Sequence, residues 1–198
     1  IEVAVAACYC KDPVRLDYIK TPKKDMHRDM AAQCFMLKTD QVTKQTRYVG
    51  KNSFVFPQFY GSFYTDCARN LWEAIGKMSL ATADGTPLRE HLAENGIKSL
   101  GACDPKLTPK SGTFEYHLKE VEDDFWNRRF KVYTQWKHDW YGKYRENGGF
   151  TTLTGFRIEG MYRRNQVLNY PVQGSAFPCL LWTLIRLQRK LRKRGMQA

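Results

Sequence analysis

The spacing of apolar residues along the 198-residue chain predicts a mainly helical protein. Between residues 26 and 37 apolar side chains recur every three or four positions, which is the period of an amphipathic helix. Asp25 precedes this segment and is a residue type that caps helix N-termini. A second stripe with the same period covers residues 114–144 and is rich in Trp and Phe, so we expect a long helix there that faces the core.

Further helices are predicted at residues 1–10, from Asp40 through the segment that carries Arg47 and Lys51, and at residues 66–77, 161–168 and 175–194. Proline lacks the backbone N–H of a helical residue, so Pro57 should kink or interrupt its helix and Pro171 should break the helical run near residue 168. In residues 150–158 apolar and polar side chains alternate on either side of a glycine, which favours a β-hairpin. The predicted fold class is therefore mainly α with a small β-hairpin (α+β).

Charge narrows the range of partners. Thirty-two Lys and Arg residues against twenty Asp and Glu give a net charge of +12. A protein this basic usually meets a polyanion, with nucleic acid the first candidate, although a basic domain without such a partner has the same composition. The longest apolar run, residues 176–185, is about half of what spans a bilayer, so no membrane partner is expected and the predicted location is cytoplasmic.

The segment from residue 46 to residue 64 combines cations with aromatic rings. Arg47 and Lys51 are four residues apart and share one helix face, where they can grip the same multivalent anion. The aromatic residues that follow are Phe54, Phe56, Phe59, Tyr60, Phe63 and Tyr64. Since every nucleobase has a π-face, an aromatic ring further along the cationic face could stack on a base. This pattern favours a site for a nucleoside triphosphate.

Three motifs occur in a fixed order along the chain. They are Ile1-Glu2 followed by Asp25-Met26-His27, then R-x-x-x-K at 47–51 followed by Tyr60-Gly61, then T-L-T-G-x-R at 152–157 followed by N-Y-P-V-Q-G-S-A at 169–176. Together they resemble the fingers and adjoining palm of family A DNA polymerases, the bacterial DNA polymerase I group. The F-V-F-P-Q-F-Y-G variant is more similar to viral or phage members. The resemblance extends to about Arg194, with residues 80–115 excepted.

The resemblance implies an arrangement of subdomains and a function. Residues 1–15 would be a palm fragment at the end of motif A, residues 16–168 the fingers with a variable excursion at about 80–115, and residues 169–198 a palm helix leading toward motif C. The implied function is that of a segment of a DNA-directed DNA polymerase, a nucleotidyltransferase, that binds the incoming dNTP and the primer–template. The alternative is a non-catalytic DNA-binding subunit of a naturally split polymerase.

Roles for single residues also follow from the resemblance. Glu2 matches a glutamate that reads the sugar edge of the nucleotide, and His27 matches a histidine that contacts the triphosphate. Arg47 and Lys51 match cations that hold the phosphates during catalysis, with Lys51 also a candidate general acid toward the leaving pyrophosphate. Fixed cations suit this task because charge spreads over the transferring phosphates.

The remaining matched residues concern the base pair and the DNA. Tyr60 matches a tyrosine beside the nascent base pair and template base. Asn169 and Gln173 match amides that contact the primer–template, and neutral amides suit the minor-groove acceptors shared by all correct base pairs. A position usually held by arginine is an asparagine here, but Arg163 and Arg164 lie close by in the sequence and are included as DNA-binding candidates.

The stacking aromatic residue departs from the family pattern. The usual spacing from Lys51 leads to Val55, whereas counting back four residues from Tyr60 leads to Phe56. One extra residue is therefore expected between Lys51 and Tyr60, absorbed as a bulge near Pro57. Phe56 is our first choice for the residue that meets the nucleotide, and Phe54 is the second.

The resemblance finally implies Mg²⁺, held by two aspartates of motifs A and C that this sequence does not contain. Two-metal phosphoryl transfer needs those ligands. We therefore expect no metal site on this chain and no polymerisation by the chain alone. The expected partners are dNTP, primer–template DNA, and the remaining palm and thumb, in cis or as a separate chain.

Overall fold

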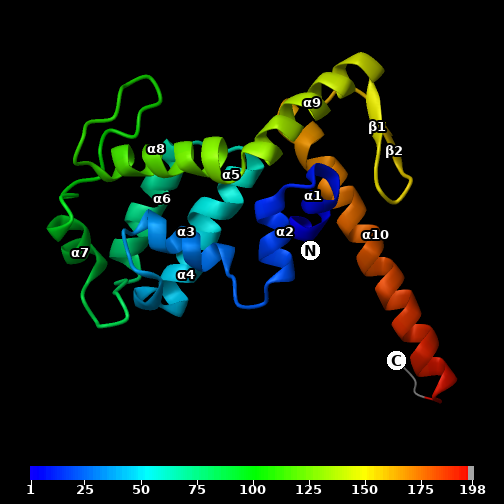
Figure 1. Cartoon of the computed structure of the whole chain (residues 1–198), viewed down its shortest axis with the longest axis horizontal. Helices are drawn as coiled ribbons and strands as arrows, with labels where there is room; N and C mark the ends of the chain where they lie inside the picture. The colour runs from blue at the N-terminus through cyan, green and yellow to red at the C-terminus, as the bar shows by residue number, and fades with distance from the viewer. Residues whose placement is uncertain (196–198) are drawn as a thin grey trace. The chain divides into compact units, whose positions relative to one another are not determined.

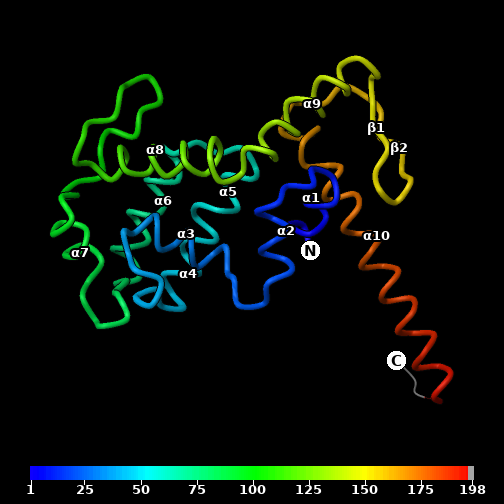
Figure 2. Tube along the Cα trace, viewed as in Figure 1, coloured from blue at the N-terminus to red at the C-terminus, as the bar shows by residue number. Residues whose placement is uncertain are grey.

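A computed structural model describes residues 1–195 of the chain. These residues are mostly helical and contain one two-stranded antiparallel sheet, so the predicted fold class is confirmed. The chain forms two compact units, which we call unit 1 (Ile1–Ile19 and Val132–Ala198) and unit 2 (Lys20–Lys131). The trace leaves unit 1 after Ile19, forms unit 2, and returns to unit 1 at Val132 (Figure 2). The palm and fingers boundaries given above stay predictions.

Unit 2 is built from helices that are joined by short turns as far as α6 and by longer loops before and after α7 (Figure 1). In order they are α3 (Met26–Cys34), the 3₁₀ turn η1 (Thr39–Gln41), α4 (Lys44–Gly50), the π turn η2 (Lys51–Val55), α5 (Phe56–Tyr60), α6 (Tyr64–Lys77), α7 (Leu88–Glu94), α8 (Phe114–Asp124) and the π turn η3 (Phe125–Arg129). Helix α3 packs on α4, and α6 packs on α8. The excursion at 80–115 forms α7 and loops, and it buries Leu88, Leu92 and Ile97 in the core.

Two predicted helix boundaries in unit 2 are wrong. The helix that carries Arg47 begins at Lys44 and not at Asp40, because the Thr43 hydroxyl accepts the backbone N–H of Thr46 and caps it there. The predicted helix at 114–144 is interrupted at η3, after which Phe130 has non-helical backbone angles (φ −111°, ψ 37°). Helix α9 (Lys131–Asn147) then continues the apolar stripe in unit 1.

Pro57 does not interrupt its helix. The chain stays helical from Lys44 to Tyr60 and ends at Gly61, which has the left-handed φ of 91° that suits glycine. The π turn η2 ends at Val55, two residues before the proline, and a π turn holds one residue more than an α turn. The predicted bulge near Pro57 is thus confirmed.

Unit 1 consists of α1 (Glu2–Cys10), α2 (Pro13–Lys20), α9, the strands β1 (Gly149–Thr151) and β2 (Arg157–Glu159), and α10 (Arg164–Lys193) (Figure 1). The predicted hairpin is confirmed, with Phe150 paired to Ile158. Phe150 packs with Tyr144 and Val167 in a small core, and α1 packs along α10.

Helix α10 corrects the predicted break at Pro171. It continues for 30 residues through Pro171 and Pro178, and each proline leaves the carbonyl four residues earlier without its helical donor. Both carbonyls have substitutes. The Trp140 indole N–H donates to Val167 O at 3.1 Å, and the Thr154 hydroxyl donates to Gly174 O at 3.3 Å. Residues outside the helix therefore compensate for the hydrogen bonds that the prolines remove.

Replacing Trp140 with Phe should destabilise unit 1 by about 1–3 kcal/mol, since the buried Val167 carbonyl loses its donor. Urea unfolding followed by circular dichroism measures this. Trp136→Phe is the matched control, because Trp136 stacks in the same aromatic row and no hydrogen bond of its indole N–H is found among the described residues. In a Pro171→Ala background residue 171 regains its N–H, so the Trp140→Phe loss should shrink. An equal loss in both backgrounds would show that packing alone explains it.

Candidate functional site

The π turn η2 sets the phase of the aromatic residues relative to the cations. The Phe56 N–H donates to Lys51 O, an i→i+5 bond, so Phe56 lies one turn along the helix from Lys51. The Lys51 ammonium lies 4.8 Å from the centre of the Phe56 ring. Arg47, Lys51, Phe56 and Tyr60 therefore follow one another at successive turns.

The same helical phase gives Phe54 and Phe56, the two candidates for the residue that meets the nucleotide, different environments. Phe54 is fully buried and meets Phe125 edge to face at 5.6 Å, so it belongs to the core between η2 and η3. Phe56 is half-buried beside the cations, and Tyr60 at the end of α5 is 48% exposed. Of Phe54 and Phe56, only Phe56 is accessible to a ligand.

Asp25 joins the first turn of α3 to Arg47. Its Oδ1 accepts the backbone N–H groups of His27 and Arg28 at 3.0 and 3.2 Å, so the predicted cap is confirmed. The same carboxylate binds Arg47 through Nε–Oδ2 at 2.5 Å and Nη2–Oδ1 at 3.1 Å. Burial alone would raise the pKa of Asp25, but the Arg47 hydrogen bonds and the backbone donors outweigh it and hold this pKa below its usual value.

His27 lies against the same cations. Its ring meets Phe56 edge to face at 5.8 Å, and its buried Nδ1 has no hydrogen-bond partner among the described residues. Burial is the main cause that lowers the pKa of His27, and the nearby charges of Arg47 and Lys51 lower it further. The imidazole is therefore neutral at pH 7.

Unit 2 thus brings His27, Arg47, Lys51 and Phe56 together at the N-terminus of α3. Asp25 caps the helix N-terminus and pairs with Arg47, so Lys51, the outer edge of the Arg47 guanidinium and the neutral His27 imidazole are the groups that favour a multivalent anion here. Phe56 and Tyr60 offer aromatic surface next to it. Sequence reasoning had assigned Asp25 only to the cap and missed its pairing with Arg47, because nothing local connects residues 22 positions apart.

The other predicted residues lie in unit 1. Glu2 is exposed in the first turn of α1. Arg163 occupies the N-cap position of α10, where its backbone N–H donates to Gln166 Oε1, and the guanidinium of Arg164 lies 5.8 Å from the Tyr141 ring centre. Asn169 and Gln173 are four residues apart on α10, so their amides share a helix face, with Asn169 half-buried and Gln173 exposed.

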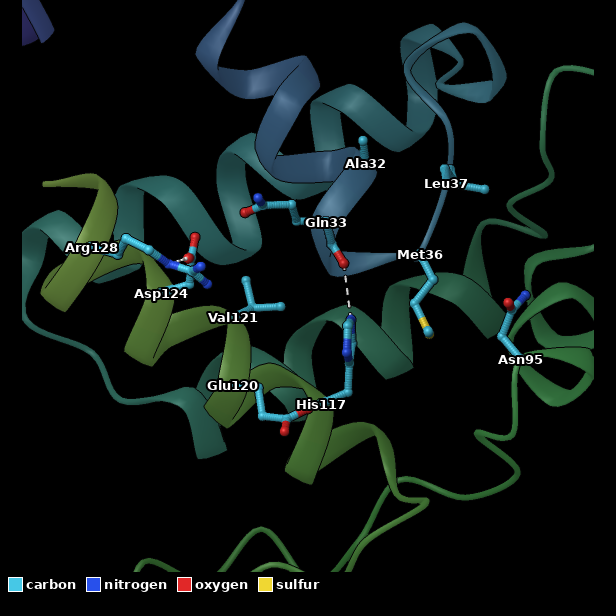
Figure 3. A pocket seen from close by; sticks show the side chains of 10 residues that line it. All are labelled: Ala32, Gln33, Met36, Leu37, Asn95, His117, Glu120, Val121, Asp124 and Arg128. Carbon is cyan, nitrogen blue, oxygen red and sulfur yellow. Dashed lines mark hydrogen bonds and ion pairs between the residues drawn. The ribbon is translucent and has the colours of Figure 1, made fainter. Parts of the chain in front are cut away.

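A separate cavity of about 520 Å³ in unit 2 contains none of the predicted site residues (Figure 3). It lies between the end of α3 and one face of α8, where His117 Nε2 donates to the Gln33 carbonyl at 2.9 Å. Asp124 and Arg128 close one side as an ion pair. Its charged residues are of both signs, Glu120 and the Asp124–Arg128 ion pair, which distinguishes it from the cationic site around Arg47.

The described residues show neither a metal-binding cluster nor a membrane-spanning helix. Among residues 1–195, no group of three or more His, Cys, Asp or Glu side chains is arranged to hold a metal ion. No helix in the described part of the chain is long and apolar enough to cross a bilayer.

Comparison with known proteins identifies relatives along the whole chain. The chain is 26% identical over 200 residues to DNA polymerase I of Aquifex aeolicus (strain VF5) and 24% identical over 198 residues to the DNA polymerase of Bacillus phage SP01. Its fold is similar to the POL domain of Pol1 from M. smegmatis, solved in complex with DNA primer-template and dNTP, with a TM-score of 0.62 at 18% identity. No family model matches the chain.

These matches cover all of this chain but only 28%, 18% and 29% of the respective relatives. The predicted resemblance to DNA polymerases of the polymerase I group is therefore confirmed for a segment that spans less than a third of those proteins.

The lowered pKa of His27 should make unit 2 less stable in mild acid. The unfolded chain takes up this proton near pH 6.5, whereas the folded chain resists it, so stability falls as the pH drops below about 6.5. Urea unfolding at pH 7.5 and pH 5.5 should show a smaller acid loss in His27→Gln than in the wild type. Identical losses in both proteins would contradict this electrostatic description of His27.

Proposed function

We propose that this chain is the nucleotide- and DNA-binding segment of a DNA-directed DNA polymerase, and that unit 2 carries the dNTP site. The observation that supports this most is the single face formed by Arg47, Lys51 and Phe56 beside His27. A triphosphate would bind Arg47 and Lys51, with His27 donating from Nε2 to a phosphate oxygen. The base or sugar would lie against Phe56.

Unit 1 would contribute contacts to the sugar and to DNA. Glu2 would read the sugar edge of the incoming nucleotide. Asn169 and Gln173 would donate from their amides to minor-groove acceptors, and Arg163 and Arg164 would contact phosphates. The solved relative was captured with primer-template and dNTP, which is the pair of ligands that this assignment requires.

The reaction in the complete enzyme would be nucleotidyl transfer. The primer 3′-hydroxyl oxygen bonds to the α-phosphorus of the dNTP and releases its proton to water, the bond from the α-phosphorus to the bridging oxygen breaks, and pyrophosphate leaves. Arg47 would stabilise charge on the phosphates, and Lys51 would donate a proton to the leaving pyrophosphate. Tyr60, exposed at the end of the same helix, would lie beside the nascent base pair.

Mg²⁺ is implied by the resemblance, but the described residues do not fit it, since none of their acidic clusters suits a metal. We therefore assign the metal to parts of the polymerase outside these residues and derive no step through it. In this proposal the chain supplies the nucleotide and DNA contacts and the proton from Lys51, but no metal ligand.

Removing either cation should weaken binding of dATP to the purified chain by about tenfold or more, because a hydrogen bond to a charged group contributes about 1.5–3 kcal/mol. Isothermal titration at low salt compares Arg47→Ala and Lys51→Ala with Lys44→Ala. Lys44 is an exposed cation at the start of the same helix and should matter little. Equal affinity in all four proteins would refute the proposed site.

Replacing Phe54 should mainly lower stability, whereas replacing Phe56 should mainly weaken nucleotide binding. Phe54→Ala should cost about 3–5 kcal/mol of stability, since Phe54 is fully buried. Phe56→Ala should leave unit 2 folded but weaken dATP binding while affecting inorganic triphosphate less, because only the nucleotide has a base and sugar to contact. Thermal unfolding and titrations with both ligands measure this. A Phe56 variant that binds dATP normally would remove Phe56 from the site.

A further inference from the structure

We propose that Asp25 is a positioning residue of the candidate triphosphate site, orienting the Arg47 guanidinium toward a phosphate. This inference rests on the function proposed above. Asp25 occupies the Nε side of the guanidinium with a bidentate pair, through Nε at 2.5 Å and Nη2 at 3.1 Å. Nη1 has no hydrogen-bond partner in the described chain and stays available to a phosphate oxygen.

The bidentate pair fixes the plane of the guanidinium as well as its position. Arginine and a carboxylate can form two parallel hydrogen bonds, and these two bonds fix the plane of the guanidinium, whereas a single contact would not. Arginine has many rotamers, so without this pair a bound phosphate would have to select one of them. With the pair in place, that selection is made before the ligand arrives.

The same carboxylate also anchors the guanidinium to the first turn of α3. Because Asp25 Oδ1 accepts the backbone N–H groups of His27 and Arg28, Arg47 is held beside the turn that carries His27. Asp25 therefore sets the relative placement of two predicted phosphate contacts that come from different helices.

A carboxylate beside an anion site also has an opposing effect, because its negative charge repels phosphate. Removing that charge would by itself tighten binding. The side chains of Asp25 and Arg47 are 32% and 36% exposed, so water and salt screen this repulsion. We therefore expect orientation to outweigh repulsion, and the sign of the change on neutralising Asp25 decides between them.

Inorganic tripolyphosphate is the probe, because it has no base to contact Phe56 or Tyr60. Titrations of the full 198-residue chain compare the wild type with Asp25→Asn, Arg47→Ala and the double variant. Asparagine keeps the helix cap, since its side-chain oxygen still accepts backbone N–H groups, but it cannot accept both Arg47 hydrogen bonds. Asp40→Asn is the matched control for charge, because Asp40 is exposed just before α4 and makes no contact with Arg47.

Asp25→Asn should weaken binding about three- to tenfold, and Arg47→Ala at least tenfold. The double variant should match Arg47→Ala within about twofold, because Asp25 acts through Arg47. Asp40→Asn should leave affinity unchanged or slightly tighter. In ¹H–¹⁵N spectra the Arg47 Nε–H signal should be sharp and protected in the wild type and averaged in Asp25→Asn.

The outcomes separate this inference from the proposed function. If Arg47→Ala weakens binding while Asp25→Asn binds as tightly as the wild type or more tightly, the positioning role is refuted and the triphosphate site stands. The same holds if Asp25→Asn weakens binding equally with and without Arg47, since its effect then comes through α3. If the wild type does not bind tripolyphosphate, or Arg47→Ala has no effect, the proposed function is refuted and this inference with it.

Discussion

The close approach of α3 and α4 is the contact on which the candidate site depends. A Cβ atom at Gly50 would lie 2.8 Å from the Ala31 Cβ and 3.0 Å from its Cα, which is closer than folded proteins allow. Glycine at this position lets the two helix backbones meet. That approach places the start of α3, with Asp25 and His27, against the cationic face of α4.

A second constraint is the π turn that follows this contact. It is one residue longer than an α turn, so it moves Phe56 onto the side of Lys51 and turns Phe54 into the core. Phe54 then meets Phe125, the first residue of the other π turn, in an edge-to-face contact. The extra residue of the π turn thereby changes the helix phase, and the rings of Phe54 and Phe125 pack edge to face behind it. π turns of this kind often occur at functional sites.

In unit 1, hydrogen bonds from neighbouring elements compensate for the two prolines inside α10. Two prolines inside α10 remove helical donors, and the carbonyls they leave are satisfied by Trp140 and Thr154. Tyr9 adds a hydroxyl that donates to the Pro171 carbonyl at 3.2 Å and bonds with Ser175 at 2.8 Å. The helix that presents Asn169 and Gln173 is therefore continuous because α9, α1 and the hairpin support it.

The sequence by itself determined the features that depend on local spacing. Apolar periodicity located most helices, alternation around a glycine located the hairpin, and the residue type of Asp25 identified the cap of α3. The count of residues between Lys51 and Tyr60 indicated an insertion, and the ordered motifs pointed to DNA polymerases.

Only the tertiary structure decided features that join distant positions. Helix α10 passes through Pro171 because Trp140 supplies a donor from another helix, and no local rule contains that partner. Phe56 is accessible and Phe54 is not because Phe125 packs against Phe54. Asp25 binds Arg47 because Gly50 lets two helices come close, and the energy of such a pair depends on distance in space, which sequence separation does not give.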